Sequence, residues 1–145
     1  MFRATLFAAT LALAGPASAD FITRTVDGSF DDIAFGVETA IVGRGLVIDS
    51  VSHVGDMLER TRADVGSTVT LFTQANVYQF CSATLSRKVM EADPMNIRFC
   101  PYGVVVMETP DDPGKITLGY DSLPDGAMQE VQALLADIVA EAAGD

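Results

Sequence analysis

The sequence predicts one α+β domain in which a mixed or antiparallel sheet of about five strands has helices packed on one face. Two observations support this class. Segments that alternate like strands and segments with helical periodicity follow one another in the order β-α-β-α-β-α-β-β-α. The last two strands are joined by too few residues for a parallel crossover, so at least this pair is antiparallel.

The first half of the chain predicts two strand-helix units. A strand is expected at residues 21–26, and Ser29 can cap a helix with acidic residues in its first turn. That helix has an apolar face and ends at a glycine, Gly43 or Gly45. A second strand at 46–51 is followed by a short helix at 53–63, which Gly66 ends.

The second half predicts a strand at 67–73 and a helix over 77–92, because apolar residues there are four apart: Val77, Cys81, Leu85 and Val89. A hairpin follows, with strands at 104–107 and 116–120. Asp125 can cap a last amphipathic helix. Its apolar stripe suits packing on the sheet or on a second subunit, and comprises Met128, Val131, Leu135, Ile138 and Ala142.

The N-terminus has the pattern of a secretory signal peptide. Arg3 supplies a positive start, residues 4–14 are almost wholly apolar, and Ala17-Ser18-Ala19 offers small residues to a signal peptidase. An apolar run of about 11 residues is too short to span a bilayer, which needs about 20. We expect residues 1–19 to be removed after Ala19 and residues 20–145 to form one periplasmic domain.

The charge of the expected mature chain is strongly negative. Arg3 is the basic residue lost with the leader and all acidic residues lie after it, so eight basic residues face twenty acidic ones, a net charge of −12. Such a surface repels phosphate backbones and anionic lipid. We expect no nucleic-acid binding and no stable membrane association, and instead a small ligand or a protein partner.

Cys81 and Cys100 are the only cysteines. In an oxidising compartment an even count favours a disulfide, and closing a loop of about 20 residues stabilises a fold by roughly 3 kcal/mol. Two alternatives stay open. Cys81 can be a buried free thiol on the apolar face of its helix, or the pair can carry out thiol redox or sulfur-transfer chemistry.

No motif indicates an enzyme, and non-catalytic behaviour is favoured. The chain lacks a nucleophile elbow, a P-loop, a CxxC pair and an HExxH pair, and it has a single histidine, His53. Imidazole, thioether and thiolate together suit copper or haem iron, so the ligands of any bound metal would be His53, Met57, Cys81 and Cys100. The favoured expectation is no cofactor.

Several separated motifs resemble one bacterial family, domain of unknown function 302. They are residues 53–61, 80–83 and 91–94, with Asn96, and Cys100-Pro101-Tyr102 before a valine-rich strand. The resemblance covers roughly residues 30–120. It implies a compact α+β fold and a homodimer, and brings no established activity. Arg60, within the first motif, could line a groove against Tyr102.

These observations predict an exported binding or accessory protein with an apolar pocket bordered by Cys81, Cys100 and His53. The alternatives are a thiol-dependent redox or sulfur-transfer protein and a dimeric assembly protein without a ligand. The close approach of Cys81, Cys100 and His53 is the geometric expectation on which the favoured hypothesis depends.

Overall fold

A computed structural model describes residues 19–145, so nearly all of the predicted leader lies outside the described part. The described chain forms one five-stranded sheet of order β1-β5-β4-β3-β2 in which every neighbouring pair is antiparallel. The strands are β1 (Phe21–Asp27), β2 (Val47–His53), β3 (Gln74–Cys81), β4 (Tyr102–Glu108) and β5 (Lys115–Asp121). The α+β class and the predicted order of elements are confirmed.

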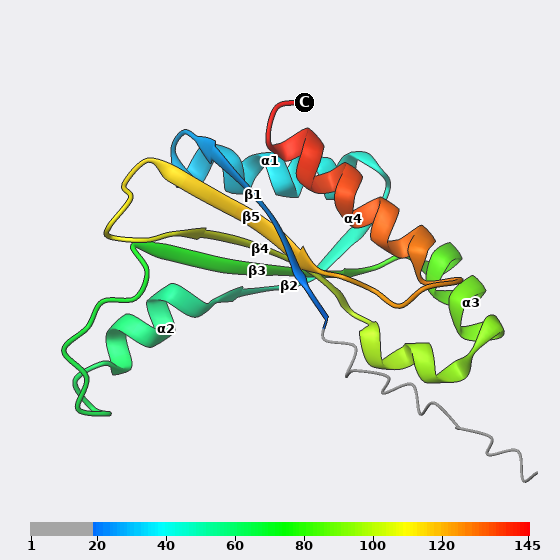
Figure 1. The fold of residues 1–145 in the computed structure, drawn as a ribbon, viewed down its shortest axis with the longest axis horizontal. Helices are drawn as coiled ribbons and strands as arrows, with labels where there is room; N and C mark the ends of the chain where they lie inside the picture. The colour runs from blue at the N-terminus through cyan, green and yellow to red at the C-terminus, as the bar shows by residue number, and fades with distance from the viewer. Residues whose placement is uncertain (1–18) are drawn as a thin grey trace, which may run out of the picture.

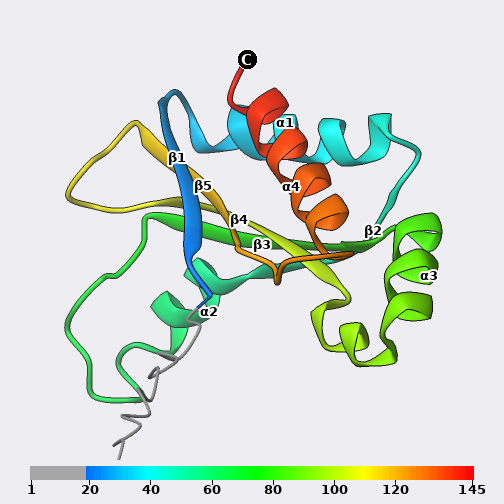
Figure 2. The same ribbon diagram turned by 45° about the vertical axis from the view of Figure 1, so that its right-hand side comes forward.

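Helices α1 (Phe30–Gly43) and α4 (Gln129–Ala142) lie side by side over one face of the sheet (Figures 1 and 2). Between them and the sheet lies the core, to which the strands contribute Tyr78, Phe80, Val104, Val106, Ile116 and Leu118. Ser29 caps α1 as predicted, its hydroxyl accepting a hydrogen bond from the amide of Asp32. Burial of these apolar side chains is the main stabilising term.

The apolar stripe of α4 is core. Met128, at the helix N-cap, and the four stripe residues within the helix are all buried, with at most 8% of each exposed. The stripe therefore packs on the sheet, which was the first of its two predicted uses. Because the stripe is buried within the subunit, it no longer supports a homodimer. The expectation of a homodimer then rests on the family resemblance alone.

The boundary between the third strand and the third helix was predicted wrongly. Residues 67–73 form a loop, β3 begins at Gln74, and Val77 and Cys81 lie in that strand. Ser82 ends the strand and caps α3 (Ala83–Ala92), where its hydroxyl accepts from the amide of Leu85. The four-residue spacing of Val77, Cys81, Leu85 and Val89 crosses this boundary, so it does not mark one helical face.

Three further helical elements lie at the two ends of the sheet. Helix α2 (Val54–Thr61) and the loop after it lie at the end where β3 begins. Helix α3 and the 3₁₀ helix η1 (Pro94–Phe99), which the sequence did not predict, lie at the opposite end (Figure 2). No helix among residues 19–145 is long and apolar enough to cross a membrane.

Candidate functional site

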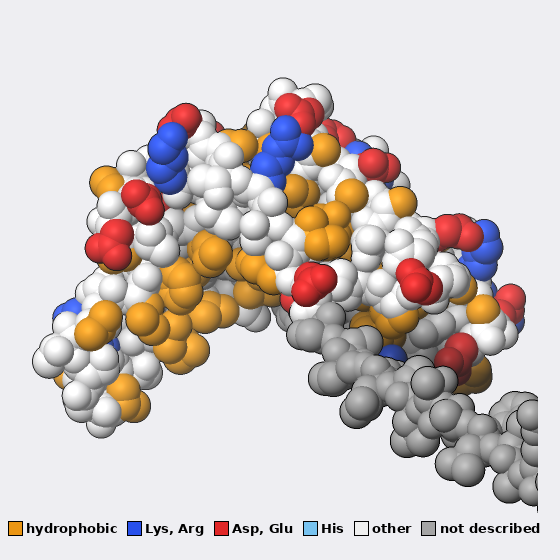
Figure 3. Space-filling model, viewed as in Figure 1, with side chains coloured by type: hydrophobic (Ala, Val, Ile, Leu, Met, Phe, Trp, Pro, Cys, Tyr) orange, Lys and Arg blue, Asp and Glu red, His pale blue; other side chains and the backbone are white. Residues whose placement is uncertain are grey.

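The sheet face opposite α1 and α4 is apolar at its centre. Side chains alternate along a strand, so with Tyr78 and Phe80 buried in the core, Val77 points to the open face. Its partner in β4 is Val105, which alternates with the buried Val104 and Val106. Figure 3 shows hydrophobic side chains gathered in the hollow between α2 and the sheet. A half-exposed apolar sheet face is a common location for a binding surface.

A pocket of about 300 Å³ lies at the end of the sheet where η1 is attached. Residues of the open face line it together with three residues of the core side, Tyr102, Tyr120 and Leu135. Its floor comes from β3 and β4, through Val77, Gly103 and Val105. Its walls are Phe21 on β1, Leu123 after β5, and the segment Arg98-Phe99 with Pro101. A pocket of this size whose lining combines apolar and polar groups is typical of small-molecule sites.

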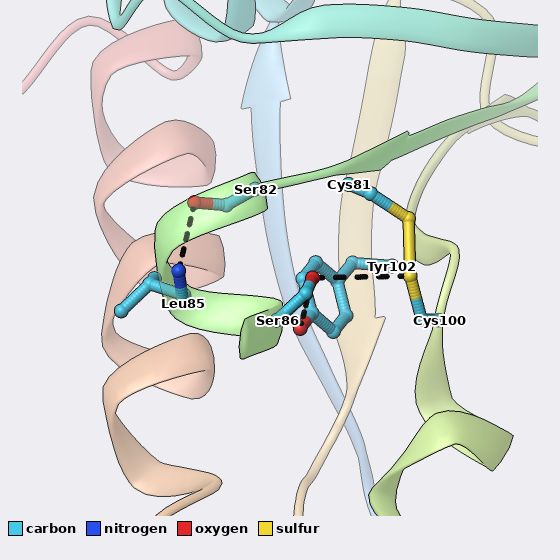
Figure 4. The surroundings of a disulfide bond; sticks show 6 residues. All are labelled: Cys81, Ser82, Leu85, Ser86, Cys100 and Tyr102. Atoms are coloured by element: carbon cyan, nitrogen blue, oxygen red, sulfur yellow. Dashed lines mark hydrogen bonds between the residues drawn. A yellow bond between two sulfur atoms is a disulfide. The ribbon is translucent and has the colours of Figure 1, made fainter. Parts of the chain in front are cut away.

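The disulfide Cys81–Cys100 holds one wall of this pocket. Cys81 is the last residue of β3 and Cys100 caps η1, and their Cα atoms are 6.4 Å apart. In Figure 4 the bond joins the strand end to the segment that leaves η1. The predicted disulfide is present and the alternative of a buried free thiol is wrong, since the described chain has no free cysteine.

Around the disulfide, hydrogen bonds tie α3 to the start of β4. The hydroxyl of Ser86 lies 3.0 Å from that of Tyr102 and 3.9 Å from the Cys100 sulfur (Figure 4). Tyr102 is buried, and its ring packs edge-on against Phe80 at a centroid distance of 6.2 Å. These contacts make Tyr102 a support of the disulfide region, and Tyr102 is also the one predicted site residue that lines the pocket.

Neither His53 nor the two cysteines line this pocket, which the disulfide touches only through Phe99 and Pro101 beside Cys100. The expectation of a pocket bordered by Cys81, Cys100 and His53 is therefore wrong. His53 pairs with Asn76 at one end of the β2–β3 ladder, and Val47 pairs with Cys81 at the other. Six residues of extended strand separate the two ends, roughly 20 Å. The sequence places His53 near a helix, but the direction of β2 carries it away from the disulfide.

His53 lines a second, polar cavity of about 320 Å³ between α1 and the β2–β3 ladder. Its Nδ1 is 2.9 Å from the side-chain oxygen of Asn76, whose amide group donates to the Tyr78 hydroxyl at 3.4 Å. Burial raises the pKa of Tyr78, the Asn76 hydrogen bond opposes this, and the charge of Glu38 adds to it. The net effect is a pKa of Tyr78 above its ordinary value, with burial as the largest cause.

The remaining predicted site residues lie on α2, at the far end of the sheet from Tyr102. Met57 lines an apolar hollow of about 300 Å³ beneath α2, with Leu58, Val69 and Leu71. Arg60 is exposed and forms no ion pair within residues 19–145. The predicted groove between Arg60 and Tyr102 is therefore absent from the described chain.

The proposed metal-ligand set is not assembled. His53 and Met57 lie at the α2 end, and the two cysteine sulfurs are bonded to each other at the other end. Within residues 19–145 no three His, Cys, Asp or Glu side chains come close enough together to hold a metal ion. The donors present do not fit copper or haem iron at either end of the sheet.

Most residues of the pocket were not predicted from the sequence, among them Phe21, Arg98, Phe99, Gly103 and Asp121. Arg98 and Phe99 immediately precede Cys100, and this adjacency was the available signal for them. Phe21 and Gly103 could not be found in this way, because only the strand order β1-β5-β4-β3 brings them to one pocket.

The fold and the pocket define a class: an antiparallel sheet covered by helices on one face, with a disulfide-held pocket on the other. Domain of unknown function DUF302 matches residues 22–144, so the chain belongs to this family, as its motifs suggested. A crystal structure of an uncharacterized conserved DUF302 protein from Bacillus stearothermophilus is similar, with a TM-score of 0.60 and 16% identity. The match covers 85% of this chain and 92% of that one, and it supports the fold. No curated protein matches the sequence.

Proposed function

We propose that this protein is an exported, non-catalytic binding protein that holds a small apolar or amphipathic molecule in the pocket between β3, β4 and η1. The observation that carries the proposal is the pocket itself, a hollow of mixed apolar and polar lining with one wall tied to the sheet by a disulfide. A wall held by a covalent link is ordered before the ligand arrives, which lowers the entropic cost of binding.

Export is supported by the leader pattern at residues 1–19 and by the disulfide. Disulfides persist in oxidising compartments such as the periplasm. In this proposal the pocket depends on an oxidising compartment. In a reducing compartment the disulfide would be lost, and η1 would no longer be linked covalently to β3.

Gly103 allows the pocket to be filled without disturbing the fold. A Cβ atom at this position would meet Val77 Cγ1 at 3.8 Å, an ordinary van der Waals contact. Gly103→Val therefore places methyl groups in the pocket while improving strand propensity. We expect saturable binding of the dye 1-anilinonaphthalene-8-sulfonate to the native protein, measured by fluorescence, and at least about tenfold weaker binding to this variant, a loss of about 1.4 kcal/mol.

Gly43→Ala is the matched control, since a Cβ there has nothing within 4 Å and the residue lies at the end of α1. Its dye affinity should equal that of the native protein. Equal affinity in the Gly103→Val variant would place the dye elsewhere, for instance in the hollow beneath α2, and would contradict the proposal.

A further inference from the structure

The pocket between β3, β4 and η1 contains two charged side chains of opposite sign, Arg98 and Asp121. Most basic side chains of this acidic protein form ion pairs with Asp or Glu. Within residues 19–145 these are Arg24, Arg44, Arg62, Arg87, Lys88 and Lys115. Arg98 and Arg60 are the two that do not, and Asp121 is likewise outside every ion pair of the described chain. The two charges of the pocket do not neutralise one another.

Arg98 contacts an aromatic ring and forms no ion pair within residues 19–145. Its guanidinium carbon lies 4.6 Å from the centre of the Phe99 ring, a cation-π contact. A guanidinium presents five N–H donors, and a cation-π contact with a ring does not replace a hydrogen-bond acceptor for them, so they can bind a carboxylate. Phe99 precedes Cys100, so the disulfide also restrains the residue on which Arg98 stacks.

Asp121 reaches the pocket from another wall. It ends β5 and pairs in register with Phe21 of β1, which also lines the pocket. Val77 and Val105 line the same pocket, so its lining combines apolar side chains with both charges. A ligand that satisfies every part of this lining has an anionic group, a cationic group and an apolar group.

We propose that the ligand is a zwitterion with a large apolar substituent, of the class of free α-amino acids with aliphatic or aromatic side chains. The inference rests on the binding function proposed above and names its ligand class. The carboxylate accepts hydrogen bonds from Arg98, the ammonium group donates to Asp121, and the side chain lies on Val77 and Val105. A ligand with one charge leaves either Arg98 or Asp121 without its counterpart.

Isothermal titration of the exported protein with three probes tests this assignment: L-leucine, N-acetyl-L-leucine, which lacks the cation, and L-leucinamide, which lacks the anion. We expect each single-charge probe to bind about fivefold more weakly than leucine, the effect of one partly exposed ion pair. Arg98→Gln should weaken leucine and N-acetyl-leucine and leave leucinamide unchanged. Asp121→Asn should weaken leucine and leucinamide and leave N-acetyl-leucine no weaker.

Arg60→Gln and Asp64→Asn change the net charge by the same amounts at exposed positions outside this pocket, and they should leave all three affinities unchanged. Equal binding of the three probes, or equal losses in the Arg60 and Arg98 variants, would overturn the zwitterion assignment. If none of the probes binds while Gly103→Val still abolishes dye binding, the assignment is wrong and the binding pocket stands. If Gly103→Val also leaves dye binding intact, the binding function fails as well.

Discussion

Phe80→Ala is expected to lower the free energy of unfolding by about 3–5 kcal/mol, the usual cost of removing a buried aromatic ring. Phe80 has no exposed surface, lies near the end of β3 in the core, and packs edge-on against Tyr102. The variant leaves a cavity next to the hydrogen bonds that support the disulfide region. Chemical denaturation followed by circular dichroism measures the change.

Phe35→Ala provides the control with the same chemical change. Phe35 lies on α1 with 69% of its surface exposed, so its loss should alter the unfolding free energy by no more than about 0.5 kcal/mol. Comparable losses in the two variants would mean that the core does not lie between α1, α4 and the sheet, contrary to the fold described above.

Replacing both cysteines, Cys81→Ser with Cys100→Ser, should cost about 3 kcal/mol of stability under oxidising conditions, because the disulfide closes a loop with a sequence separation of 19. The same variant should bind 1-anilinonaphthalene-8-sulfonate more weakly, since η1 loses its tether to β3. Denaturation and dye titration of the folded variant below its unfolding temperature measure the two effects separately.

Reduction of the native protein serves as the control for the serine substitutions and should reproduce both losses. Undiminished dye affinity in the double variant would contradict a structural role of the disulfide at the pocket. A native protein whose disulfide is reduced rapidly by a small thiol, with one cysteine alkylated far faster than the other, would instead favour the thiol-chemistry alternative.

The parts of the fold that local sequence determines were predictable. Helix α1 follows from the Ser29 cap and a periodic apolar face, and the β4–β5 hairpin from two alternating strands around a turn. The start of β3 was not predictable in this way. Residues 67–73 alternate as well as a strand does, and residues 74–81 become one because β2 and β4 pair with them.

The candidate site was predictable only where the chain itself brings residues together. The cysteine count and the compartment indicated the disulfide, and the structure contains it. The position of His53 depended on the direction and length of β2, which a pattern of residue types does not specify. The open sheet face depended on both α1 and α4 covering the same side, so Phe21, Gly103 and Asp121 could not be grouped from sequence.

Native mass spectrometry of the protein recovered from the periplasm tests the central claim, an exported binding protein with a disulfide-held pocket, most directly. We expect the mass of a chain that starts at Asp20 and lacks two hydrogens because of the Cys81–Cys100 bond, with a bound small molecule that dissociates on denaturation. The Gly103→Val protein, prepared in parallel, should carry no such molecule. Retention of Met1, free thiols in the isolated protein, or the same bound molecule in both proteins would contradict the account.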